Sequence, residues 1–168
     1  MKNAPIDEKV LAIYPTSRGF GFVVATQPLS PVDWGTKEVH GRNKNARSME
    51  RAAALIEAHH PDVLVLEDPT APNSRHHQRI WRLAKALSAL ANTQAMEVYP
   101  FTYAAVKECF GEFGVRTRYD IAMAIAKSVP AFEQFLPPPR RAWEREHARM
   151  SVFSAAALVM TYFATRSE

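Results

Sequence analysis

Two adjacent carboxylates, Glu67 and Asp68, directly follow a short and wholly apolar run, Val63 to Leu66. Such a run is typical of a strand that is covered on both faces. Successive strand residues point to opposite faces, so one member of the pair can enter a given site. Carboxylate oxygens are preferred ligands of magnesium and manganese. The pair is therefore a candidate metal site, with an acidic turn before Pro69 as the alternative.

A second candidate set lies near the end of the sequence. His147, Ser151 and Ser154 are spaced i, i+4 and i+7, which places them on one face of a helix. A histidine there can ligate a metal ion, although a solvated residue at the helix start is the alternative. Ser154 brings no charge, and in an alanine-rich helix it can simply permit close packing.

Basic side chains form the third set. The net charge is +4 over 168 residues, which favours a polyanionic partner because neutralised phosphates release counterions. Most of the candidates are expected in loops or at helix starts, and for each one a solvated surface position is the alternative. The candidate DNA-binding residues are Arg18, Lys37, Arg42, Lys44, Arg75, Arg79, Arg140 and Arg141.

The pattern of apolar residues predicts the elements that position these side chains. Strands are expected at Val10–Ile13, Gly19–Ala25, Val32–Val39, Val63–Leu66 and Ala95–Tyr99. Helices are expected at Asn45–His60, Ser74–Ala91, Phe101–Phe110, Thr117–Ser128 and Ser151–Tyr162, with a proline-rich loop at Leu136–Arg141. A hairpin followed by strand–helix–strand units predicts an α/β domain spanning 1–168, with a five-stranded mixed sheet flanked by helices.

Composition excludes several other classes. Hydrophobic residues make up 47% of the chain, which is ordinary for a folded domain, and the single cysteine, Cys109, permits no intrachain disulfide. There is no P-loop, no glycine fingerprint for dinucleotides and no cysteine pair for zinc. Met1 to Val10 lacks the features of a secretory signal, and the apolar run Ala155 to Met160 is too short to cross a membrane. A cytoplasmic location is expected.

Four segments together carry a resemblance: Leu11–Gly21, Val32–Gly35, Leu64–Asp68 and Trp143–Ala156. In their order and spacing they resemble RuvC-type Holliday-junction resolvases, a branch of the ribonuclease-H-like superfamily, from about Val10 to Phe163. The resemblance implies the ribonuclease-H-like fold. It also implies carboxylates at the end of the first strand, at the end of the fourth strand and on the last helix, where Glu67 fills the fourth-strand position. Two divalent cations held there activate a water and stabilise the leaving oxygen of a phosphodiester.

The chain departs from that pattern at the acidic positions. Tyr14, at the end of the first strand, stands where the resemblance implies aspartate, and Ser154 stands at such a position on the last helix. His147 stands where a related branch carries a carboxylate. A phenol titrates near about 10 and is a poor ligand for magnesium at neutral pH. Glu67, Asp68 and His147 remain as metal ligands for weakly bound magnesium or manganese. We expect Tyr14, Glu67, His147 and Ser154 to meet in one shallow site, although Tyr14 also suits a core position.

These features predict a protein that binds branched or duplex DNA, with metal-dependent endonuclease activity impaired or lost. The alternatives are an active structure-selective endonuclease with a rearranged site, and a non-catalytic protein-interaction domain. The resemblance implies a homodimer, because a four-way junction offers two equivalent strands. Cleavage is expected to return with Tyr14→Asp and Ser154→Asp, with His147→Asp added if required.

Overall fold

The computed structural model describes residues 8–68, 75–141 and 147–166. Their strands are β1 (Val10–Thr16), β2 (Gly19–Gln27), β3 (Ser30–Glu38), β4 (Val63–Glu67) and β5 (Glu97–Phe101). The helices are α1 (Lys44–His59), α2 (Arg75–Thr93), α3 (Tyr103–Cys109), α4 (Arg118–Ser128) and α5 (Met150–Arg166), with short 3₁₀ turns η1 (Gly111–Phe113) and η2 (Pro130–Phe135). Within the described residues, no helix is long and apolar enough to cross a membrane.

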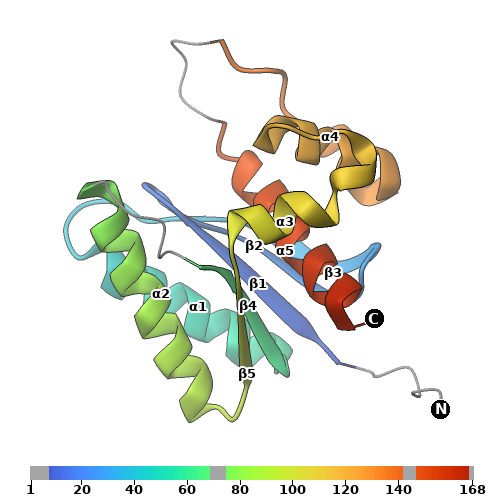
Figure 1. The fold of residues 1–168 in the computed structure, drawn as a ribbon. Coiled ribbons are helices and arrows are strands. Elements are labelled where there is room, and N and C mark those ends of the chain that lie inside the picture. Colours follow the sequence, from blue (N-terminus) through green and yellow to red (C-terminus); the bar gives the residue numbers. More distant parts are fainter. Residues whose placement is uncertain (1–7, 69–74, 142–146, 167–168) are drawn as a thin grey trace, which may run out of the picture.

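The strands form one mixed sheet in the order β3-β2-β1-β4-β5 (Figure 1). β2 pairs antiparallel with both β1 and β3, whereas β4 pairs parallel with β1 and β5. This arrangement confirms the predicted five-stranded mixed sheet, with an antiparallel hairpin beside a parallel core.

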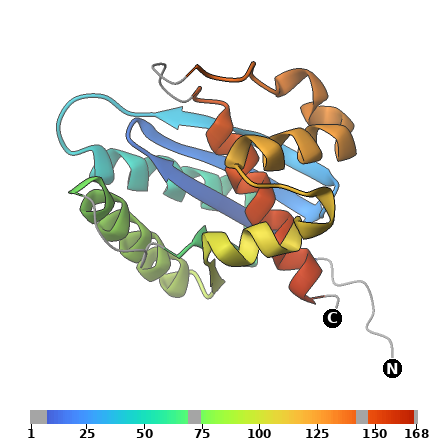
Figure 2. The ribbon, with the colours of Figure 1, turned by 45° about the horizontal axis from the view of Figure 1, so that its top comes forward.

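Both faces of the sheet are buried because the central strands are apolar over most of their length. Val10 and Ala12 of β1 join the core under α3, α4 and α5, while Leu11 and Ile13 join the core under α1 and α2. Figures 1 and 2 show these two groups of helices on opposite faces of the sheet. Helix α5 lies across the middle of its face and is buried along nearly its whole length, as its apolar sequence predicts.

Some predicted boundaries shift for local reasons. The fifth strand starts at Glu97 and not at Ala95, because Ala95 has a positive φ of 58° in the turn that follows α2. The predicted helix from Phe101 starts instead at Tyr103, because the Thr102 hydroxyl accepts a hydrogen bond from the Ala105 N–H at 3.0 Å and caps the helix. The third strand runs from Ser30 to Glu38, two residues earlier at its start than predicted.

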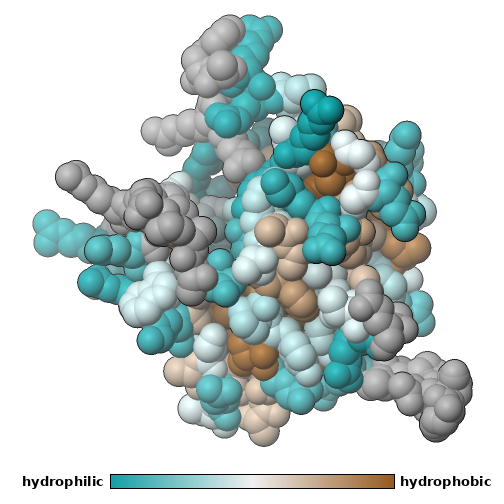
Figure 3. Space-filling view, in the orientation of Figure 1, coloured by the Kyte–Doolittle hydropathy of each residue, from teal (hydrophilic) through white to brown (hydrophobic). Residues whose placement is uncertain are grey.

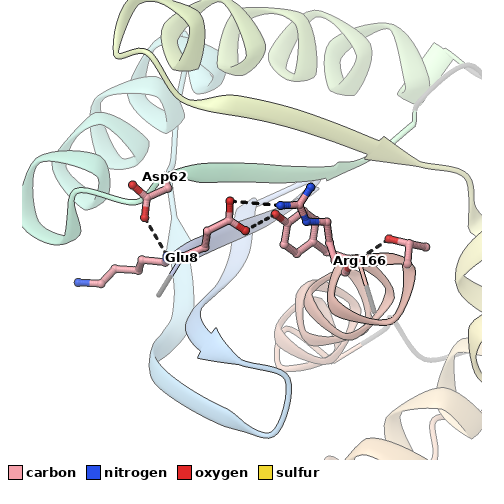
Figure 4. Close-up of polar contacts among 6 residues, drawn as sticks. Glu8, Asp62 and Arg166 are labelled. Atoms are coloured by element: carbon pink, nitrogen blue, oxygen red, sulfur yellow. Dashed lines mark hydrogen bonds and ion pairs between the residues drawn. The ribbon is translucent and has the colours of Figure 1, made fainter. Parts of the chain in front are cut away.

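Polar contacts fasten the start of β1 to α5 and to β4 (Figure 4). The Tyr162 hydroxyl donates to Glu8 Oε1 at 2.6 Å, and Arg166 Nη2 lies 3.6 Å from Glu8 Oε2. The Lys9 N–H donates to Asp62 Oδ2 at 3.0 Å. Burial and the bond to Glu8 raise the pKa of Tyr162, so this phenol stays protonated at neutral pH.

Candidate active site

Strand register brings Tyr14 and Glu67 to the same place on the sheet. Ile13 of β1 pairs with Leu66 of β4, so Tyr14 and Glu67 are the next residues along two adjacent parallel strands. Both continue the alternation of the residues that face α5. Asp68 follows Glu67, and its backbone N–H donates to the Phe101 carbonyl at 2.6 Å. Glu67 is therefore the acid that faces the last helix.

A cation that sequence reasoning did not single out fills the space beside Glu67. Arg118 Nη2 donates to Glu67 Oε2 at 2.8 Å. Its guanidinium carbon lies 4.0 Å from the ring centroid of Tyr103 and 5.1 Å from that of Tyr14. The side chains of Arg118 and Glu67 are 26% and 21% exposed, so the ion pair is partly shielded from water.

The surroundings keep Arg118 charged. Burial alone lowers its pKa, but Tyr14 and Glu67 outweigh burial, and the net effect is a raised pKa. The two tyrosine rings also attract the guanidinium through their π faces. A permanent positive charge therefore lies beside Glu67 and Tyr14.

A capping box fixes the position of Arg118. Thr117 accepts from the Asp120 N–H at 3.1 Å, and Asp120 Oδ2 accepts from the Thr117 N–H at 3.0 Å, so α4 begins at Arg118. Backbone N–H groups of Arg116 and Thr117 lower the pKa of Asp120, so this carboxylate is ionised at neutral pH.

The four predicted site residues divide between two cavities. Ser154 is 8% exposed and lines a small cavity with Glu67 and Arg118. Tyr14 and His147 line a larger cavity. Arg118 joins the two sets, since it contacts both Glu67 and Tyr14.

His147 lies at the start of α5. It is exposed, and its Nδ1 accepts from the Arg149 N–H at 3.2 Å in the turn before the helix. This placement agrees with the alternative of a solvated residue at the helix start.

The residues present do not fit a divalent metal pair. In the described parts of the chain, no group of three or more His, Cys, Asp or Glu side chains is placed to hold a metal ion, so Glu67, Asp68 and His147 do not form one. One oxygen of Glu67 is already bonded to Arg118. The ion pair makes this site electrically neutral without a metal.

The larger cavity has a volume of about 680 Å³. It lies at the end of the sheet where the β1–β2 turn and the starts of α1, α2 and α5 come together (Figures 1 and 2). Three of the candidate DNA-binding residues line it: Arg18, Lys37 and Lys44.

The other basic candidates differ in their surroundings. Arg42 is exposed before α1, and Arg140 and Arg141 are exposed after η2. Arg79 bonds to the Thr16 carbonyl and, at 2.9 Å, to Asn45 Oδ1, so its guanidinium links α2 to β1 and α1. The side chain of Arg75 is outside the described part of the chain.

Comparison with solved structures identifies the fold. A structure of T. thermophilus RuvC in complex with a Holliday junction substrate aligns with 95% of this chain and 96% of its own, at a TM-score of 0.68 and 14% identity. The chain has a RuvC-like fold. A second Thermus thermophilus RuvC structure, covered to the same extent, gives a TM-score of 0.65 at 15% identity. No family model and no curated protein matches the sequence.

The likeness to RuvC confirms the predicted ribonuclease-H-like fold, but at this identity it concerns the fold alone. That Tyr14 and Ser154 replace carboxylates of the related proteins stays a prediction. Sequence reasoning missed Arg118 and Tyr103. The Thr117–Asp120 capping pattern could have placed Arg118 at a helix start, but it does not indicate that Arg118 pairs with Glu67.

Proposed function

We propose that this chain is a DNA-binding protein with a RuvC-like fold, in which metal-dependent cleavage is impaired or lost. One observation carries the proposal: the Arg118 guanidinium is bonded to Glu67 and lies against Tyr14 and Tyr103. Two-metal cleavage uses one cation for the attacking oxygen and another for the leaving oxygen. Glu67 neutralised by an arginine offers neither the charge nor the free oxygens that two dications need.

Binding to DNA is supported by charge and by fold. Arg18, Lys37 and Lys44 line one cavity, and Arg42, Arg140 and Arg141 are exposed. Exposed guanidinium and ammonium groups bind phosphates and release counterions. The likeness to a RuvC structure determined with a Holliday junction agrees with this proposal. We assign the protein to the cytoplasm, expect a homodimer, and expect any magnesium or manganese to bind only weakly.

The alternative of a protein-interaction domain has less support on the surface. Among the residues that the structure describes, the exposed large hydrophobic ones come from separate elements: Leu29, Val32, Trp81, Phe113 and Met123. On the face seen in Figure 3, hydrophobic residues are scattered among hydrophilic ones. A docking face for another protein usually presents a continuous apolar area.

The test is fluorescence anisotropy of a labelled four-way junction and of a duplex of matched sequence at several salt concentrations. Affinity should fall steeply as the salt concentration rises. If Lys37 contacts one phosphate, Lys37→Gln should reduce the slope of the logarithm of the binding constant against the logarithm of salt concentration by about 1. Lys127→Gln, an exposed lysine in the last turn of α4, is the matched control and should leave the slope unchanged. Absence of binding at low salt would instead favour the protein-interaction domain.

The same junction, incubated with magnesium or manganese, tests cleavage. The unaltered chain should leave it intact over hours. Robust cutting that Glu67→Gln abolishes would contradict the loss of activity and establish an active endonuclease with a rearranged site.

A further inference from the structure

We infer that the 680 Å³ cavity is a binding site for one phosphorylated nucleotide, presented as a strand end or as a free mononucleotide. The inference rests on the proposed function for its link to DNA, but its evidence is separate from the Glu67 site. That evidence is the charge, the walls and the size of the cavity.

The charge of the cavity suits a phosphate monoester. Arg18, Lys37 and Lys44 line it together with one acid, Glu38. Among the described residues of the lining, three cations against one anion leave a surplus of two positive charges. A phosphodiester in a continuous strand carries one negative charge, whereas a phosphate monoester carries about 1.5 to 2 at neutral pH. The surplus therefore matches a terminal phosphate better than an internal one.

The remaining wall can receive a base and a sugar. Tyr14 and Ile80, both partly exposed, supply aromatic and aliphatic surface to the same cavity that holds the cations. A nucleobase stacks readily on such surface whatever its sequence. Pockets of about 300–1,000 Å³ take small molecules, so a volume of about 680 Å³ suits a single nucleotide.

The walls are held in place without a ligand. Lys44 Nζ donates to the Ser17 carbonyl at 3.1 Å, which joins the start of α1 to the β1–β2 turn. Arg79 bonds to the Thr16 carbonyl and to Asn45, and Asn45 Nδ2 donates back to the Arg79 carbonyl at 3.1 Å. These links join β1, α1 and α2 around the cavity. A preformed site loses less free energy to ordering when it binds.

The experiment compares one duplex in three forms: both ends closed by hairpin loops, open ends with hydroxyls, and open ends with 5′- or 3′-phosphate. The phosphorylated form should bind about tenfold more tightly than the hydroxyl form, the effect of one additional charge-assisted contact. Deoxyadenosine monophosphate and inorganic phosphate are titrated separately by calorimetry. Binding of the mononucleotide alone would identify the free nucleotide as the source, and a preference for phosphorylated ends would identify a strand end.

Thr36→Trp tests the location, because Thr36 lines the cavity from the edge strand β3, where a tryptophan is compatible with strand geometry. It should abolish the preference for phosphate. Val32→Trp on the same strand is outside the cavity lining and is the control. Lys37→Gln combined with Lys44→Gln is a second variant should Thr36→Trp fail to fold.

Equal binding of phosphate and hydroxyl ends with no binding of mononucleotide would overturn the inference, as would a preference that survives both variants. Failure of the proposed function looks different, because the closed duplex and a closed-arm junction would then not bind at all.

Discussion

Arg118 Nη2 lies 2.8 Å from Glu67 Oε2, and the two residues come from a helix start and a strand end that are 51 positions apart in the sequence. The Arg118 guanidinium balances the charge of the Glu67 carboxylate from within the chain.

Replacing the arginine should expose the carboxylate to metal ions. In Arg118→Gln we expect a loss of about 1–2 kcal/mol in the free energy of unfolding, because a charge-assisted bond that is partly shielded is lost. Millimolar manganese should then raise the melting temperature of Arg118→Gln but not that of the unaltered chain, as measured by differential scanning fluorimetry. Arg116→Gln, an exposed neighbour, is the control. An equal manganese response in both proteins would refute a blocking role for Arg118.

Restoration of cleavage should require the arginine to be removed as well. Tyr14→Asp with Ser154→Asp adds two carboxylates, but Arg118 would still neutralise one acid of the cluster. We therefore expect no cutting of a labelled junction by this double variant, and cutting in magnesium or manganese only when Arg118→Ala is added. A double variant that already cuts would show that the ion pair yields to metal ions.

The contact between β2 and α5 sets a steric prediction. A Cβ added at Gly21 would lie 2.2 Å from Ser151 Oγ and 2.5 Å from the Ser151 carbonyl carbon. Gly21→Ala should therefore cost about 1–3 kcal/mol, since the strand and the helix must move apart. Gly35→Ala on β3 is the matched control, because its Cβ would meet the Phe22 ring no closer than 3.5 Å. Urea unfolding of the two variants gives the comparison, and equal stability would contradict the close approach.

The capping box of α4 predicts a dependence on pH. The pKa of Asp120 is lowered in the folded state, so its contribution is present above about pH 3.9, the ordinary aspartate value, and is lost as pH falls through the folded value. Urea unfolding between pH 5 and pH 2.5 should show a steeper loss of stability for the unaltered chain than for Asp120→Asn. At neutral pH, Thr117→Ala should cost about 1 kcal/mol by removing the other half of the cap. Parallel pH profiles for the two chains would argue against this role of Asp120.

The sequence predicted the sheet well because the evidence for it is local. The uniformly apolar Val63–Leu66 marks a strand through burial, and a hairpin followed by strand–helix–strand units indicates a mixed sheet. Strand periodicity indicated that only one of Glu67 and Asp68 could face α5, and the choice of Glu67 followed from the resemblance. Arg118 could not be predicted as the partner of Glu67. An ion pair between residues far apart in the sequence depends on how α4 packs, and no local pattern records that packing. Arg79 illustrates the same limit: its helical spacing resembles a surface stripe, yet its guanidinium bonds to backbone and amide groups inside the fold.

The burial of α5 affects how the chain can acquire its structure during synthesis. The last strand of the sheet ends at Phe101, but the helix that covers the Val10, Ala12 and Val65 face begins only at Met150. At about 5–20 residues per second, a ribosome leaves that apolar face uncovered for seconds after the strands have emerged. During that time the apolar face is open to other molecules, and the packing of α5 ends this stage.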